Sequence, residues 1–210
     1  MRFRDRADAG RQLADRLTRF ADEEPVVVGL PRGGVSVAAE IARELKAPLD
    51  IVLVRKVGAP HRSELAAGAV GEDGVTVRNR GVLDELGLRW EDLDEQVRRE
   101  RAELVRRAHT LRPNRPRAEL ADRTVIVVDD GIATGSTVVA AMRVVRSLGA
   151  RRIVLAVPVA PADTLTQLSG LADEVVCLLA PARFRAVGQW YADFRQVSDD
   201  EVRELLDAHG

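Results

Sequence analysis

The sequence predicts an α/β fold in which an open parallel sheet is flanked by helices. Short apolar, β-branched runs are continuous rather than alternating, which is typical of strands buried on both faces. Amphipathic patterns with helical spacing separate these runs, as in repeated strand–helix–strand units. The 210 residues are 46% hydrophobic and 31% charged, which suits one globular domain, residues 1–210, with a sizeable core.

The elements follow from local patterns in chain order. An amphipathic helix is expected first, at residues 5–21. The expected strands are residues 26–30, 51–54, 125–128, 153–159 and 175–179, and the helices between them are residues 35–45, 137–148 and 162–171. Ser198 and Glu201 form a capping box, which predicts a final helix that ends at about residue 208.

A long helical pattern at residues 89–109 interrupts this alternation. Acids come early in it and arginines late, which matches the helix macrodipole. We interpret the segment of about residues 81–116 as a helical insertion packed on the core, with a proline-containing exit loop. Its arginines indicate a solvated helix face, because acids interleave with them at i to i+4 spacing; the alternative is a nucleic-acid patch.

Charge and composition exclude several classes of protein. The 32 basic and 33 acidic residues give a net charge of −1, which argues against a general nucleic-acid binder. No apolar run approaches the roughly 18 residues that span a bilayer, and the N-terminal residues are charged where a secretory peptide is apolar. We therefore expect a cytoplasmic protein without a membrane partner. A single cysteine, Cys177, excludes an intramolecular disulfide framework.

The most informative segment is residues 125–137. A buried strand delivers Asp129 and Asp130, and a loop rich in glycine and hydroxyl side chains then opens a helix. Ligands of open parallel sheets bind beyond the carboxyl ends of the strands. Glycines permit close backbone approach, and hydroxyls with free N–H groups at a helix start favour a phosphate. The expected phosphate-binding residues are Gly131, Ile132, Ala133, Thr134, Gly135, Ser136 and Thr137.

The two carboxylates are negatively charged and cannot bind the same phosphate. They can accept hydrogen bonds from neighbouring hydroxyls of a group that carries the phosphate, with Mg²⁺ nearby. A phosphorylated sugar satisfies both halves of the motif. The loop lacks the lysine of a Walker A sequence and the spacing of a dinucleotide fingerprint. The alternative is a strand–turn–helix connection with solvated acids.

The segment resembles the phosphoribosyl pyrophosphate (PRPP) motif of type I phosphoribosyltransferases. The resemblance implies that Asp129 and Asp130 hold the ribose 2′ and 3′ hydroxyls, while residues 133–137 cradle the 5′-phosphate. It also implies the type I phosphoribosyltransferase fold, a Rossmann-like open parallel sheet with a small C-terminal hood. The hood is expected at about residues 180–195.

Two further blocks are similar to parts of this family. Arg32, Gly33 and Gly34 follow the first strand, where the family holds pyrophosphate, often through a non-proline cis peptide; alone, the block is equally consistent with a tight turn. Arg55 and Lys56 resemble the start of the R-K-x-G-x-P loop of adenine-salvage members. The resemblance implies diphosphate binding by both, and the stretch to about residue 79 is expected to be a mobile loop that closes over the site.

Aromatic residues gather in the expected hood. Phe184, Trp190 or Tyr191 could stack on the flat ring of an acceptor base. The alternative is that these rings cover the sheet edge as core or as a subunit contact, as in a homodimer.

The function implied by the resemblance is transfer of 5-phosphoribosyl from Mg²⁺-bound PRPP to a nitrogenous base or amine, with release of diphosphate. Asp129, Asp130, Lys56 and Arg32 would be the catalytic residues, and Mg²⁺ would be held mainly through PRPP rather than by direct protein ligands. Members that use 6-oxopurines carry an aspartate where this chain has Ala133, which disfavours hypoxanthine and guanine. The alternative function is a non-catalytic regulatory protein of the same fold that senses PRPP or nucleotides.

Overall fold

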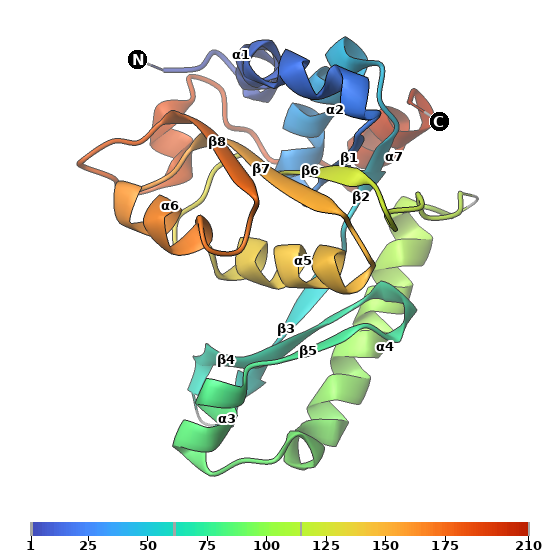
Figure 1. Cartoon of the computed structure of the whole chain (residues 1–210), viewed down its shortest axis with the longest axis vertical. Helices are drawn as coiled ribbons and strands as arrows, with labels where there is room; N and C mark the ends of the chain where they lie inside the picture. Colours follow the sequence, from blue (N-terminus) through green and yellow to red (C-terminus); the bar gives the residue numbers. More distant parts are fainter. Residues whose placement is uncertain (1, 61, 114, 210) are drawn as a thin grey trace.

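A five-stranded parallel sheet forms the centre of the molecule, with strand order β2-β1-β6-β7-β8 (Figure 1). The structure is a computed structural model that describes residues 2–60, 62–113 and 115–209. The strands are β1 Val26–Gly29, β2 Leu49–Ile51, β6 Thr124–Val128, β7 Arg152–Val159 and β8 Glu174–Leu179. This order and the flanking helices confirm the predicted α/β fold.

Helices cover both faces of this sheet. Helices α1 (Arg6–Leu17) and α2 (Gly33–Leu45) lie on one face, with α7 (Asp199–Asp207) against α2, and α5 (Ser136–Ser147) and α6 (Ala162–Leu168) lie on the other (Figure 1). Successive strand residues point to opposite faces. Val27 and Ile126 accordingly join the core beneath α1 and α2, whereas Val26, Val125 and Val127 join the core beneath α5. This is why the strand sequences are continuously apolar.

A second, antiparallel sheet was not predicted. It consists of β3 (Val54–Ala59), β4 (Arg62–Gly71) and β5 (Thr76–Arg78). The predicted strand 51–54 is therefore wrong in its extent, because β2 ends at Ile51 and β3 begins at Val54. The stretch to residue 79 is not a loop, since β4 and β5 fill most of it. Its closure over the site stays a prediction, and His61 lies outside the described residues.

Close packing explains the small residues that were interpreted as a loop. A Cβ added to Gly68 in β4 would lie 2.5 Å from the Trp90 ring and 2.4 Å from the carbonyl oxygen of Val77. Trp90 and Leu93 are buried in the short helix that precedes α4. Glycine at position 68 therefore allows the helical segment to lie directly on the antiparallel sheet.

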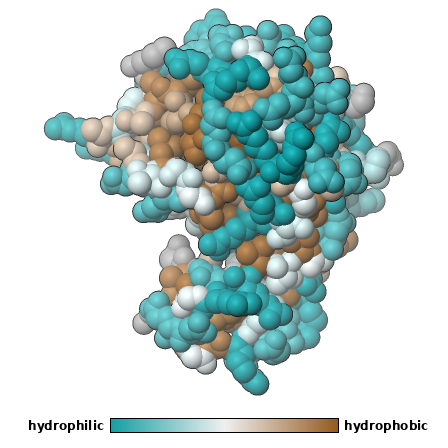
Figure 2. Space-filling model, viewed as in Figure 1, coloured by the Kyte–Doolittle hydropathy of each residue, from teal (hydrophilic) through white to brown (hydrophobic). Residues whose placement is uncertain are grey.

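The long helix predicted at residues 89–109 is confirmed as α4 (Asp94–Leu111), preceded by a 3-10 helix at Trp90–Leu93. Helix α3 (Arg80–Leu86) was not predicted. The remaining 3-10 helices are Thr18–Glu23, Glu72–Gly74 and Val187–Trp190. Helix α4 runs from the antiparallel sheet to α7, which packs on the parallel-sheet body. Figure 2 shows a hollow in the surface between the antiparallel sheet and the parallel-sheet body.

A buried ion-pair network connects the two sheets with the end of α4. Arg112 Nη1 lies 3.3 Å from the Asp50 carboxylate in β2, and Arg112 Nη2 donates to Glu72, which follows β4. The Asp50 and Arg112 side chains are 1% and 4% exposed. Asp50 also accepts hydrogen bonds from the backbone N–H groups of Ile51 and Ala118. These contacts fix the exit of α4 against the edge of the parallel sheet.

The capping box predicted for the last helix is confirmed at Ser198 and Glu201. In the part of the chain that the structure describes, none of the helices combines the length and the apolar character needed to cross a membrane.

Candidate functional site

The two acids at the end of β6 lie against the start of α2. An added Cβ at Gly33 would be 1.9 Å from Asp130 Oδ2, and one at Gly34 would be 2.7 Å from the carbonyl oxygen of Val128. Only glycine permits backbone to approach these carboxylates so closely. The turn after β1 and the end of β6 thus form one site, as expected for neighbouring parallel strands.

Asp130 is held by partners from both ends of the chain. Arg6 Nε in α1 donates to Asp130 Oδ2 at 2.7 Å, and the Arg6 guanidinium lies 3.9 Å from the centre of the Phe194 ring. The Tyr191 hydroxyl donates to the Asp130 carbonyl oxygen at 2.6 Å. Asp129 Oδ1 accepts a bond from the Asp130 backbone N–H at 2.9 Å. These contacts fix the orientation of the acid pair.

Burial raises the pKa of the Asp129 carboxyl well above its usual range, and the neighbouring charge of Asp130 raises it further. Burial also raises the pKa of Asp130, although the hydrogen bond from Arg6 acts in the opposite direction. The folded protein therefore binds protons on this pair more tightly than the unfolded chain does. The pair stabilises the fold least when both carboxyls are ionised, at neutral and alkaline pH.

Asp129→Asn is expected to raise Tm by about 2–4 °C at about pH 8, because a neutral side chain removes the cost of a second buried charge. The gain should vanish near about pH 4, where Asp129 is protonated in the folded wild type. Thermal unfolding followed by circular dichroism between these pH values measures both quantities. A gain that does not depend on pH would contradict this account of the acid pair.

The loop after the acids surrounds a cavity of about 190 Å³ that is lined by Asp129 and residues 131–138. Gly135 has a φ of 75°, a region that favours glycine, and it precedes α5 without offering a side-chain cap. The hydroxyls of Thr134 and Ser136 lie 3.4 Å apart beside this helix start. The loop can thus present N–H and hydroxyl donors to an anion.

One member of the predicted phosphate loop has a structural role. The Ile132 side chain is buried, and its backbone N–H donates to the Val159 carbonyl oxygen at the end of β7 at 2.9 Å. The Ala133 carbonyl oxygen accepts a bond from the Thr164 hydroxyl at 3.1 Å. These contacts attach the loop to β7 and α6 and hold its shape.

A second and larger cavity, of about 540 Å³, lies beside the turn that follows β1. The peptide bond between Pro31 and Arg32 is cis, as the family resemblance led us to expect. Arg32 and Arg55 both line this cavity, and so does Thr137. Because Thr137 also lines the phosphate-loop cavity, the two cavities adjoin at the start of α5.

Lys56 and Arg55 point to different places, as successive residues of a strand do. Lys56 Nζ donates to the hydroxyl of Ser136 at 2.9 Å, whereas Arg55 faces the larger cavity together with Arg32. The sequence prediction put both residues on diphosphate. That assignment stays a prediction; Lys56 contacts the loop 131–137 through Ser136, and Arg55 lines the same cavity as Arg32.

The hood aromatics divide into two groups. Tyr191 is only 2% exposed, and its ring packs against Phe3 at 5.4 Å and against Phe194 at 5.0 Å. The hypothesis that Tyr191 stacks on a base is therefore wrong. The ring is part of the core, as the alternative interpretation of the hood aromatics proposed. Phe184 and Trp190 are half-buried and keep a surface available.

Sequence reasoning missed three contributors to the site: Arg6, Arg107 and Asp199. Arg6 looks like any polar residue of an amphipathic helix, so no local signal marks it. The interpretation of the α4 arginines as solvated is wrong for Arg107, which is 24% exposed and paired with Asp199. In contrast, Arg98 and Arg99 are exposed, as expected.

Among the described residues, no three His, Cys, Asp or Glu side chains gather as a metal-binding group. The carboxylates of Asp129 and Asp130 are hard oxygen donors of the kind that Mg²⁺ prefers, directly or through water. Burial disfavours the ionised form of both carboxyls and so raises their pKa values, and a cation beside them would offset that cost. The residues present therefore fit a Mg²⁺ that arrives bound to an anionic ligand.

The parallel sheet, the acid pair and the two adjoining cavities define an α/β protein with the type I phosphoribosyltransferase fold. The chain belongs to the phosphoribosyl transferase domain family, whose profile matches residues 4–188. The resemblance inferred from residues 125–137 is thereby confirmed.

Two similar proteins extend this comparison. "Putative phosphoribosyl transferase Rv0571c" of Mycobacterium tuberculosis is 53% identical over 205 residues, which cover 98% of this chain and 46% of that protein. This chain thus spans about half the length of the curated relatives it matches. The crystal structure of TT1426 from Thermus thermophilus is 47% identical, with a TM-score of 0.92 over 100% of this chain and 99% of that chain.

Proposed function

We propose that the protein transfers 5-phosphoribosyl from Mg²⁺-bound PRPP to a nitrogenous base or amine and releases diphosphate. One observation carries the proposal: the loop cavity that includes Asp129 adjoins the cavity lined by Arg32 and Arg55. PRPP has a 5′-phosphate, ribose hydroxyls and a diphosphate in that order. The phosphate loop, the acid pair and the arginine cavity offer a complementary group for each.

The chemistry assigned to each group follows from its charge. The loop 131–137 with Lys56 would bind the 5′-phosphate, and Asp129 and Asp130 would accept hydrogen bonds from the ribose hydroxyls. Arg32, Arg55 and the backbone at Gly33 and Gly34 would bind the diphosphate. When bound, Mg²⁺ neutralises charge on the departing diphosphate.

Catalysis would be mainly electrostatic. As the bond between C1 and the diphosphate oxygen breaks, the transition state gains oxocarbenium character, and the carboxylates of Asp129 and Asp130 would stabilise that positive charge. The nitrogen nucleophile then bonds to C1 with inversion. Phe184 and Trp190 would contact the acceptor, and Ala133 argues against 6-oxopurines because it cannot handle a proton at the purine N7.

Incubation of the protein with Mg²⁺, PRPP and a panel of bases and amines tests the proposal. Diphosphate release that depends on one acceptor is the expected result, with formation of the corresponding nucleotide. PRPP binding without release for any acceptor would instead support the sensory alternative. Absence of both binding and release would contradict the assignment of the site to PRPP.

A further inference from the structure

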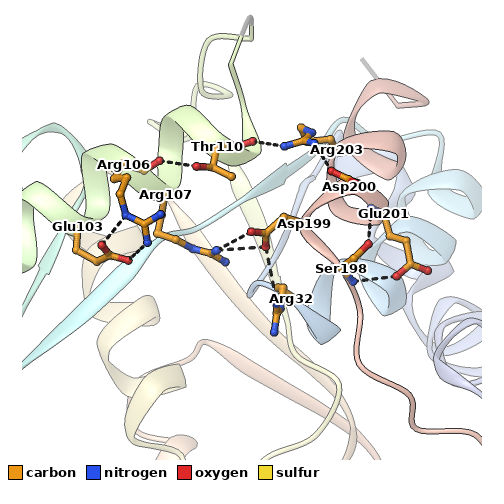
Figure 3. A network of polar contacts seen from close by, with 10 residues as sticks. All are labelled: Arg32, Glu103, Arg106, Arg107, Thr110, Ser198, Asp199, Asp200, Glu201 and Arg203. Carbon is orange, nitrogen blue, oxygen red and sulfur yellow. Dashed lines mark hydrogen bonds and ion pairs between the residues drawn. The ribbon is translucent and has the colours of Figure 1, made fainter.

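The larger cavity has a second wall, which is made by α4. Arg32 lines it from the turn after β1 and Arg55 from β3 of the antiparallel sheet, while Arg106 and Arg107 line it from the last turns of α4. Figure 3 shows Arg107 reaching from α4 towards Arg32. Four guanidinium groups from three separate segments therefore converge on one cavity.

Asp199 holds two of these groups. Its carboxylate accepts hydrogen bonds from Arg107 Nη1 at 3.0 and 3.2 Å, and Arg32 Nη1 lies 3.7 Å from the same carboxylate (Figure 3). The three side chains are 24%, 34% and 29% exposed for Arg107, Arg32 and Asp199. The bridge is thus partly exposed, and two of its members, Arg32 and Arg107, line the cavity.

The contacts of Asp199 are not those of a helix cap. Ser198 and Glu201 already cap α7 through their reciprocal hydrogen bonds. The other two acids of this first turn pair elsewhere: Asp200 with Arg203 of the same helix, and Glu201 with Arg195. Asp199 instead contacts Arg107 of α4 and Arg32 of the turn after β1, two of the arginines that line the cavity.

The charge of the cavity indicates the chemistry of its ligand. Four arginines line the cavity, and three acids pair with them: Glu103 with Arg106, Glu100 with Arg55, and Asp199 with both Arg107 and Arg32. The arginines still outnumber these acids, so the cavity favours an anion. A neutral base has no negative charge and too few acceptor atoms to pair with four guanidinium groups. Diphosphate presents several charged oxygens, and arginine binds such groups in a bidentate manner.

We propose that Arg107 of α4 is a diphosphate-binding residue and that Asp199 is the counter-ion that holds Arg107 and Arg32 before the ligand arrives. This inference rests on the proposed function and deepens it, because it gives α4 a part in the binding site. The diphosphate displaces the carboxylate of Asp199 as a partner of Arg107. The two residues should therefore have opposite effects on affinity.

Isothermal titration with inorganic diphosphate in the presence of Mg²⁺, and separately with ribose 5-phosphate, tests Arg107. Arg107→Gln is expected to weaken diphosphate binding by about 10- to 100-fold, the loss typical of a charged hydrogen-bond donor. Ribose 5-phosphate should bind within about twofold of wild type, because it contacts only the phosphate loop and the acid pair. Arg99→Gln is the matched control, since Arg99 is an exposed arginine of α4 outside the cavity.

Asp199→Asn is expected to change diphosphate affinity in the opposite direction to Arg107→Gln. Removing this negative charge is expected to tighten diphosphate binding by about 3- to 10-fold, because the bound anion no longer lies near a like charge. Weaker binding by Asp199→Asn, or unchanged diphosphate binding by Arg107→Gln, would overturn the inference. A wild-type protein that binds neither ligand would refute the proposed function itself, so the two failures are distinguishable.

Discussion

Replacing either carboxylate of the acid pair is expected to abolish most phosphoribosyl transfer. Asp129→Asn and Asp130→Asn should each lower kcat/KM for PRPP by about 100-fold or more, because in the proposed reaction each carboxylate stabilises the developing cation at C1. Asparagine has nearly the same shape, and at position 130 it keeps one oxygen that can accept the Arg6 hydrogen bond. Steady-state assays of diphosphate release measure the effect.

Asp22→Asn is the matched control for this prediction. Asp22 is exposed and precedes Glu23, whose carboxylate accepts a hydrogen bond from Thr124 at the beginning of β6, the end opposite the acid pair. Its replacement should leave turnover unchanged. Because Asp129→Asn is expected to stabilise the fold, loss of activity by that variant cannot be attributed to unfolding. Full activity of both acid-pair variants would refute the role given to these carboxylates.

The largest effect on stability is expected at Arg112. Replacing it with methionine leaves Asp50 and Glu72 buried without their cation, and breaking such a buried pair costs about 3–5 kcal/mol of unfolding free energy. Burial already raises the pKa of Glu72, and the Arg112 charge opposes that rise. Urea unfolding of the wild type and the variant measures the loss.

Arg89→Met is the appropriate comparison, because Arg89 and Asp92 form an exposed ion pair with side chains 79% and 38% exposed. A pair of this kind contributes about 0–1 kcal/mol. If Arg112→Met costs no more than Arg89→Met, the buried network does not hold the exit of α4 against β2.

The parallel sheet could be predicted because each of its strands packs against a hydrophobic core on both faces of the sheet. Residues such as Val26 and Val27 contact opposite layers, so the run is apolar throughout and carries a signal that depends on local sequence alone. The acid pair and its loop could be predicted for a similar reason. Their residues are contiguous in the chain, and their order along it is the order of the chemical groups they would bind.

The antiparallel sheet and the second wall of the cavity could not be predicted in this way. Gly68 looks like a flexible position, whereas the space it leaves is filled by Trp90, a residue that follows it by more than twenty positions. Arg6, Arg107 and Asp199 come from three distant segments, and each has an ordinary helical context in the sequence. Only the tertiary structure shows which arginine reaches the cavity and which faces solvent.

The most direct test of the account is a crystal structure of the protein with Mg²⁺ and PRPP. The account predicts the 5′-phosphate within the loop 131–137, the ribose hydroxyls on Asp129 and Asp130, and the diphosphate beside Arg32 and Arg107. Well-defined PRPP bound elsewhere on the protein, or bound with its ribose turned away from both aspartates, would contradict the central claim.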